Sequence, residues 1–218
     1  MDKKQFTPEI TSFIDSPDVI EKVQRQIAYI LKGETSNQYI LAGYYKLIDK
    51  SIYNMRIYVE NARPYDFEND PPKTPFVNIL LSKTSSSSNA RMGQQKMKAV
   101  FFIDCIAFGN DAGEGWDKKA AAVRAWKAAR IVRRIVMSDQ YVYLGMRGTV
   151  GSRNVVSMEA AVPENGGDAV TTVLVRITLE IEYLECAEST IGEILEGIDF
   201  DIDMSNGEVL KTNYRKEA

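Results

Sequence analysis

The side chains that most often carry catalysis are missing or isolated in this sequence. Its 218 residues include no histidine, the one side chain that ordinarily titrates near neutral pH. Ser/His/Asp triads, Cys/His dyads and histidine-ligated metal sites are therefore excluded. Glu180 and Glu182 stand two residues apart on a predicted strand, without a neighbouring partner for acid–base chemistry. We expect a protein that is not an enzyme and that needs no cofactor.

Two short patterns are similar to ligand sites but incomplete. Asp199, Asp201 and Asp203 alternate as oxygen ligands do in a calcium loop, but the glycine and the glutamate required at the sixth and twelfth positions are missing. The segment 145–151 has glycine at every third position but lacks the Lys-Ser/Thr pair of a phosphate-binding loop. We predict a solvated strand edge for the aspartates, bent or bulged strands for the glycines, and no metal site.

Positive charge gathers on one predicted helix. The alanine-rich segment 117–138 predicts a helix that packs closely against a sheet. Its outward and flanking positions, here called the basic helix face, carry Arg124, Lys127, Arg130, Arg133 and Arg134. This face fits a solvated exterior, a contact with nucleic-acid phosphates, or an ion-paired contact with an acidic segment of the same or a neighbouring subunit. A net charge of −3 argues against a dedicated nucleic-acid binder.

The acidic segment that could form ion pairs with the basic helix face is the C-terminal one, 187–218. No basic residue occurs in it before Lys211, and isoleucine, leucine and phenylalanine alternate with the acidic residues. The carboxylates that we expect to contact a partner are Glu193, Glu196, Asp199, Asp201 and Asp203. We predict an acidic arm, separate from a domain at 1–186, that docks on another surface.

A second basic region precedes the basic helix. The segment 82–95 is polar and rich in small residues, which predicts a long flexible hairpin loop. Lys83 and Arg91 give this loop a positive charge in an acidic protein. We expect both residues to contact a subunit or partner.

Periodicity and turn residues define the other elements. Ser16 and Pro17 begin a helix that Gly33 should end, and apolar spacing favours a short helix over 38–48. Strands are predicted over 52–60, 76–81, 96–108 and 172–184. We therefore predict an α+β fold, in which a mixed or antiparallel sheet of about four strands is packed by two helices, with an insertion at 36–74 and a C-terminal arm.

Two of these strands differ in their alternation. In 172–184 the apolar residues alternate strictly with polar ones, which indicates a half-buried strand. The strand at 96–108 is apolar on both faces, because Val100, Phe102, Ile106 and Phe108 point away from the first apolar face. A helix should cover one face, and another element or another chain should cover the second.

Thiols and targeting features indicate an intracellular protein. Two cysteines, Cys105 and Cys186, are too few for a disulfide framework, and we predict buried thiols in a reducing compartment. The first residues lack the apolar core of a secretion signal, and no run approaches the roughly 20 apolar residues that span a bilayer. We expect assembly in the cytoplasm and no membrane partner.

The order of the predicted elements and the residue types along them resemble those of the tail terminator proteins of tailed bacteriophages. The resemblance covers about two-thirds of the chain and rests on the opening helix at 16–33 and on four segments. These are PFVNI at 75–79, AVFFI at 99–103, ARIVRRI at 129–135 and VLVRITLEIEY at 173–183. No invariant motif carries it, and the insertion and the arm are longer than a minimal member needs.

The resemblance implies a virion protein of the tail or neck. Such a protein forms a ring, expected to be a hexamer, that caps the tail tube, stops its polymerisation and joins the tail to the head connector. The implied partners are further copies of the chain, the tail tube protein, the head-completion or connector protein and, if the tail contracts, the sheath. DNA would pass through the lumen without sequence-specific binding.

One alternative function and one structural question remain open at this stage. A related head–tail connector or neck protein would use the basic helix face to contact DNA. Tyrosines at 39, 44, 45, 53, 58 and 65 either form an aromatic surface for a partner or pack on the core.

Overall fold

The computed structural model describes residues 17–46, 50–60, 74–86, 94–109, 118–161, 171–186, 202–203 and 209–210. The chain divides into two units, Asp15–Ala187 and a second one made of Met1–Ile14 and Glu188–Ala218. In the second unit, β6 (Ile202–Asp203) pairs antiparallel with β7 (Val209–Leu210). All further elements belong to the first unit.

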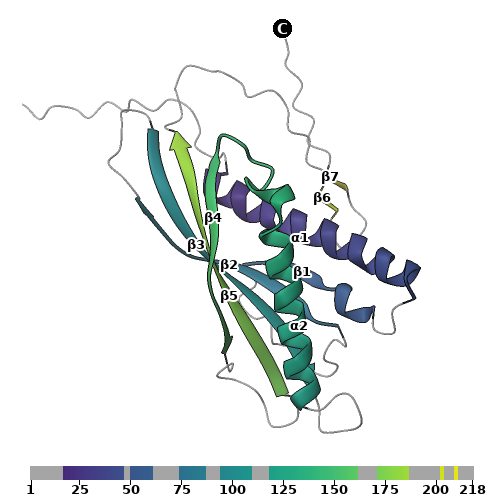
Figure 1. Cartoon of the computed structure of the whole chain (residues 1–218). Coiled ribbons are helices and arrows are strands. Elements are labelled where there is room, and N and C mark those ends of the chain that lie inside the picture. Colours follow the sequence, from purple (N-terminus) through teal and green to yellow (C-terminus); the bar gives the residue numbers. More distant parts are fainter. Residues whose placement is uncertain are drawn as a thin grey trace, which may run out of the picture. The chain divides into compact units, whose positions relative to one another are not determined.

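The first unit is a mixed five-stranded sheet with two helices, which confirms the predicted α+β class with one strand more than expected (Figure 1). The strands are β1 (Arg56–Val59), β2 (Phe76–Ser86), β3 (Gln94–Gly109), β4 (Val150–Ala161) and β5 (Thr171–Cys186). Their spatial order is β1-β2-β3-β5-β4, with β1 parallel to β2 and the other pairs antiparallel. The helices are α1 (Val19–Tyr44) and α2 (Lys118–Val136), and short 3-10 helices form η1 (Ser51–Tyr53) and η2 (Asp139–Tyr141). None of the described helices is long and apolar enough to cross a bilayer.

Both helices cover the same face of the sheet, here called the front face (Figure 1). The alanine stripe of α2 is buried against β3 and β5, as its small residues predict. α1 crosses near the C-terminal end of α2 and contacts β1 and β2. One continuous apolar core therefore lies between the two helices and the sheet.

Helix α1 is longer than its sequence signals predict. It runs through Gly33, so the two predicted helices are one element of 26 residues. Ile30, Leu31 and Thr35 are all buried, and the Thr35 hydroxyl donates to the Leu31 carbonyl at 2.7 Å. Burial on both sides of Gly33 outweighs the roughly 1 kcal/mol that an interior glycine costs. The N-cap is Asp18, and its side chain makes no capping bond.

The hairpin of β2 and β3 extends into the segment predicted as a flexible loop. β2 reaches Ser86 and β3 begins at Gln94, so both ends of the range 82–95 are strand, and residues 87–93 lie outside the described residues. The ladder continues because Ser86 still pairs with Met97, beyond a register shift after Leu81. The predicted insertion also contributes to the sheet, since β1 lies within it, although the predicted strand 52–60 begins as η1.

The opposite face, here called the back face, also buries apolar side chains. Ile106 and Phe108 are buried with Phe76 and Leu174 in a small cluster, and Val100 is buried as well. Apolar side chains on both faces of β3 are therefore buried within the chain, as expected for a strand that is apolar on both sides. The alternation predicted for β5 is confirmed, because its front-face residues from Val175 to Tyr183 are buried.

Candidate interaction surfaces

The basic helix face is only partly exposed. Arg130, Arg133 and Arg134 are exposed on α2, as predicted. Arg124 and Lys127 are half-buried and already make interactions of their own. The surface that α2 offers to a partner therefore centres on the three exposed arginines.

Sequence reasoning missed the apolar residues that share this exposed surface. Val123 and Trp126 expose 59% and 42% of their surface, and Met137 is also exposed just after the helix. Val123 and Trp126 lie seven and four residues before Arg130, and Met137 lies seven residues after it, which places all three on the same side of α2 as Arg130. Tryptophan and arginine are the residues most enriched at protein–protein hot spots. Helical spacing alone could have identified this arginine–tryptophan surface.

The other predicted contact residues are not brought to α2 by the described structure. Lys83 is exposed on β2, where it pairs in register with Val100 on the back face. Arg91, Glu193, Glu196, Asp199 and Asp201 lie outside the described residues. Asp203 belongs to β6 of the second unit, and its side chain is not described. Pairing between the arm and α2 therefore stays a prediction.

The C-terminal end of α2 is fixed to β4 by one arginine. The Arg153 side chain donates to the carbonyl of Val136 and, at 2.6 Å, to that of Ser138. A cation at a helix C-terminus complements the dipole and satisfies carbonyls that lack helical partners. Burial lowers the pKa of Arg153. This contact holds the start of the connection between α2 and β4 in place.

That connection contains the spaced glycines, and it forms turns before it forms a strand. Gly145 and Gly148 have φ values of 72° and 92°, which favour glycine. The Gln26 side chain of α1 lies so close to Gly145 that an added Cβ would be 2.9 Å from it. Gly151 lies at a register shift between Val150 and Ser152. The predicted bulge is confirmed at Gly151 and wrong at the other two glycines.

The turn also bonds directly to α1. The Tyr141 hydroxyl donates to a Glu34 carboxylate oxygen at 2.5 Å, and this bond, more than burial, raises the pKa of Tyr141. Leu144 is fully buried in the front core with φ of 51°. The turn is therefore held rigidly against the helix.

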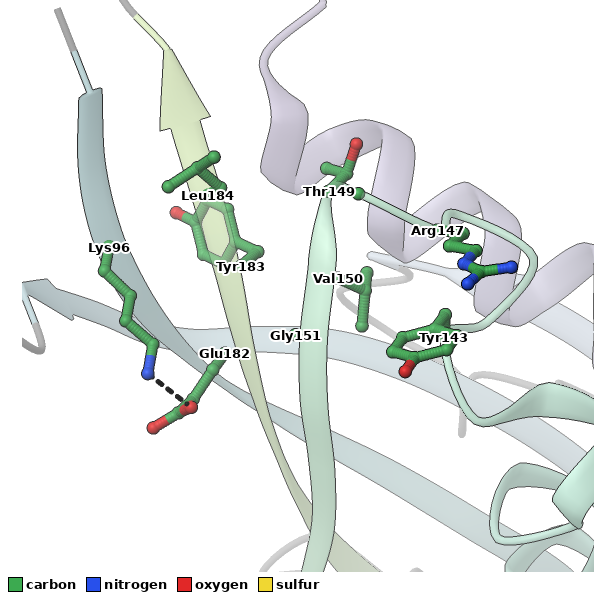
Figure 2. A pocket seen from close by; sticks show the side chains of 10 residues that line it. Lys96, Tyr143, Arg147, Thr149, Val150, Gly151, Glu182, Tyr183 and Leu184 are labelled. Carbon is green, nitrogen blue, oxygen red and sulfur yellow. Dashed lines mark ion pairs between the residues drawn. The ribbon is translucent and has the colours of Figure 1, made fainter.

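A pocket of about 440 Å³ opens between this turn and the sheet (Figure 2). The turn and β4 contribute Tyr143, Arg147, Gly148, Thr149, Val150 and Gly151, and the neighbouring strands contribute Lys96, Glu182, Tyr183 and Leu184. Lys96 pairs with Glu182 at 3.0 Å. Hydrogen bonds from Lys96 and then Ser152 lower the pKa of Glu182. The pocket thus combines an aromatic and aliphatic lining with charged groups at its rim.

The far end of α1 exposes aromatic and aliphatic side chains. The tyrosine end, as we call it, consists of Tyr39, Ile40, Leu41, Tyr44 and Tyr45. Tyr44 exposes 79% of its surface, and Ile40 and Tyr45 each expose 68%. The rings of Tyr44 and Tyr45 contact edge to face at 5.2 Å, and Lys50 lies over the Tyr39 ring.

The predicted tyrosine cluster therefore splits between both interpretations. Tyr53 packs against the front core, and Tyr58 contacts Phe76 on the back face. Tyr65 lies outside the described residues. Only the tyrosine end of α1 remains available to a partner.

The two thiols differ from each other. Cys105 is buried as predicted, and burial raises its pKa, followed in effect by the nearby Asp104. Cys186 is exposed at the end of β5, so its predicted burial is wrong. Within the described part of the chain, no three histidine, cysteine, aspartate or glutamate side chains group as a metal site would require.

Comparison with known proteins identifies no relative. A scan against protein-family models and a search of curated proteins found no match to this chain.

Proposed function

We propose that this protein is a structural subunit of a bacteriophage tail or neck. Copies of it form a ring that caps the tail tube, ends tube polymerisation and joins the tail to the head connector. The proposal combines the resemblance of the sequence segments with surfaces suited to protein contacts, and it assigns the chain a structural rather than a catalytic role.

The observation that carries the proposal is the outward surface of α2. Arg130, Arg133 and Arg134 stand beside exposed Val123 and Trp126 on a helix whose other side is fully buried. Tryptophan, methionine and arginine are enriched at interfaces, where rigid aromatic groups and planar guanidinium groups contribute most of the affinity. The exposed large apolar side chains of the described residues lie mostly on the helices and in the turn after α2, and the proposal therefore places the assembly surface there.

The test is assembly of the purified full-length protein. We expect light scattering to give the mass of a closed oligomer and negative-stain images to show rings. Added to polymerising tail tube protein, the rings should bind one end of each tube and stop its growth. A monomer at high concentration that leaves tube growth unchanged would overturn the proposal.

A charge reversal on α2 tests which surface forms the ring. The variant Arg130→Glu with Arg134→Glu should weaken ring formation, because it removes two exposed cations from the proposed interface. The control, Lys22→Glu with Lys32→Glu, makes the same change in charge at exposed positions of α1. Equal oligomer masses for the two variants would remove α2 from the interface.

The three exposed arginines also favour a second candidate, a neck protein that contacts DNA. Phosphate contacts release counterions, so DNA retention on this protein should fall steeply as salt rises. The variant Arg130→Glu with Arg134→Glu distinguishes the two candidates. If it abolishes DNA retention and leaves the oligomer mass unchanged, the DNA-contacting neck protein is favoured over the capping ring.

A further inference from the structure

We propose that the tyrosine end of α1 in one copy docks into the pocket beside β4 of a neighbouring copy. This inference rests on the proposed ring and specifies one of its subunit contacts. It assigns a partner to the exposed tyrosines of α1, and it adds to the interface the pocket beside β4, which the sequence did not reveal.

The two surfaces lie at opposite ends of one rigid helix. The tyrosine end occupies the last two turns of α1, which extend past β1 (Figure 1). The pocket lies beside the first half of α1, because the turn that lines it includes Gly145, next to the Gln26 side chain of that helix. A helix of 26 residues is about 39 Å long. The tyrosine end of a chain therefore cannot enter the pocket of the same chain.

The chemistry of the pocket suits a tyrosine ring. Leu184, which is half-buried, provides an aliphatic contact, and the exposed Tyr143 offers an aromatic edge. Arg147 is exposed at the rim, where its guanidinium can lie over an incoming ring. The Thr149 hydroxyl can bond the phenol oxygen. Tyrosine serves well in such contacts because it buries a large area while losing little side-chain entropy.

The tyrosine end supplies the matching features. Tyr44 and Ile40 lie one turn apart on the same side of α1, and Tyr45 is in edge contact with Tyr44. Residues 36–46 contain no acidic side chain that would have to be desolvated on docking. The one charged residue of this range is Lys46, which follows the two tyrosines, so the rings that enter the pocket carry no charge themselves.

Two different surfaces at opposite ends of a subunit make a heterologous contact. Such contacts close into a ring when the rotation between subunits allows closure, whereas identical surfaces meet in two-fold dimers. A single inserted helix end buries less than the roughly 800 Å² per partner of a stable interface. Docking therefore acts together with the arginine–tryptophan surface of α2.

The first test removes the inserted side chains. Tyr44→Ala with Tyr45→Ala should weaken association at least 30-fold, which corresponds to the loss of one hot-spot residue. The control, Tyr29→Ala, removes a tyrosine that is 71% exposed on the same helix, about 22 Å from Tyr44. It should leave association within twofold of the parent. Equal effects from both variants would overturn the proposal.

The second test identifies what meets the tyrosine end. Tyr44→Cys and Arg147→Cys are made separately in a Cys186→Ser background, since the remaining Cys105 is buried. When the two proteins are mixed and oxidised, the two thiols lose two electrons and two protons to an added oxidant such as diamide and form one disulfide. We expect covalent dimers with one copy of each variant, and no dimers from either protein alone.

The remaining outcomes each overturn the docking proposal. Dimers from Tyr44→Cys alone would mean that two tyrosine ends meet across a two-fold axis. Rings without any disulfide would leave the proposed function standing and remove this contact, whereas monomers would remove both. An Arg147→Cys thiol that is shielded from a maleimide in monomeric protein would mean that the chain fills its own pocket.

Discussion

The two faces of the sheet bury their side chains by different means. On the front face, α1 and α2 cover an apolar core that includes Phe101, Ile103 and Cys105 of β3. On the back face, the alternating residues of the same strand contact an arginine of β5. The Asp104 carboxylate pairs with Arg176, and the Phe102 ring stacks on the Arg176 guanidinium. Helices cover an apolar front face, whereas the back face combines a small buried apolar cluster with a charged pair.

The centre of the back face is a polar row that crosses all five strands. In register order it consists of Tyr58, Asn78, Asp104, Arg176 and Glu159. Arg176 donates two hydrogen bonds of 2.8 Å to the Asp104 carboxylate, which is almost fully buried. Farther along, Lys96 pairs with Glu182 and Lys98 with Glu180. Because a slip of one residue would move these charges to the apolar face, the row fixes the strand register.

This difference shows where the chain keeps its free surface. Neither face of the sheet carries a large exposed apolar patch, since the exposed large apolar residues of the described chain lie mostly on α1, on α2 and in the turn after α2. Val59 and Val156 are exceptions on the edge strands. The polar row thus lies on the sheet, whereas the helices and the turn after α2 carry most of the exposed large apolar side chains of the described residues.

The sharpest test of the comparison is a pair of adjacent phenylalanines on β3. Phe101→Ala should lower the free energy of unfolding by about 3–5 kcal/mol, because it opens a cavity in the front core. Phe102→Ala should lower it by only about 1–2 kcal/mol, because that ring is half-buried and mainly stacks on Arg176, 4.4 Å from its centroid. Urea unfolding followed by circular dichroism measures both. Equal losses would mean that the back face is packed as tightly as the front.

The next effect in size concerns the buried ion pair. Asp104→Ala should lower the free energy of unfolding by about 2–3 kcal/mol, because it removes two charge-assisted hydrogen bonds from an arginine that is still 30% exposed. A double-mutant cycle with Arg176→Ala should give a coupling of similar size. In the matched cycle, Lys98 and Glu180 on the same two strands are both half-buried, whereas Asp104 is almost fully buried, and their coupling should stay below about 1 kcal/mol. Equal couplings would show that burial adds nothing to the Asp104 pair.

Local patterns predicted the elements whose packing is regular. Strict alternation identified β5, and the alanine stripe identified α2, because each has one buried face with a fixed period. The end of α1 was missed because Gly33 is a strong local stop signal. It is overridden by burial of Leu31 and Thr35, which depends on contacts far along the chain. Local signals also did not reveal that β1 pairs in parallel with β2.

The candidate surfaces were predictable to different degrees. The five basic residues of α2 are visible in the sequence, but which of them stay exposed depends on neighbours in space. Trp126 could have been included from its spacing of four residues from Arg130. The pocket could not have been predicted, because Lys96, Gly148 and Leu184 come from separate segments that only the register of β3, β5 and β4 brings together.

The smallest effect is expected at the exposed end of the back face, where it depends on pH. Lys96, followed by Ser152, holds the pKa of Glu182 below its ordinary value of 4.5. A lowered folded-state pKa gives stability that is present above the unfolded value and is lost as pH falls through the folded one. Glu182→Gln should therefore cost about 0.2–1 kcal/mol at pH 7 and nothing once both proteins are uncharged at this position in acid.

Chemical unfolding at pH 7 and below pH 3 measures this difference, and Glu159→Gln, at an exposed position of β4, is the control for the same chemical change. A cost for Glu182→Gln that persists in acid would show that the side chain acts through packing and not through its charge. The ladder at this end would then stabilise the sheet in the same way as the front core, and the contrast between the two faces would be confined to the Asp104–Arg176 pair and its neighbours.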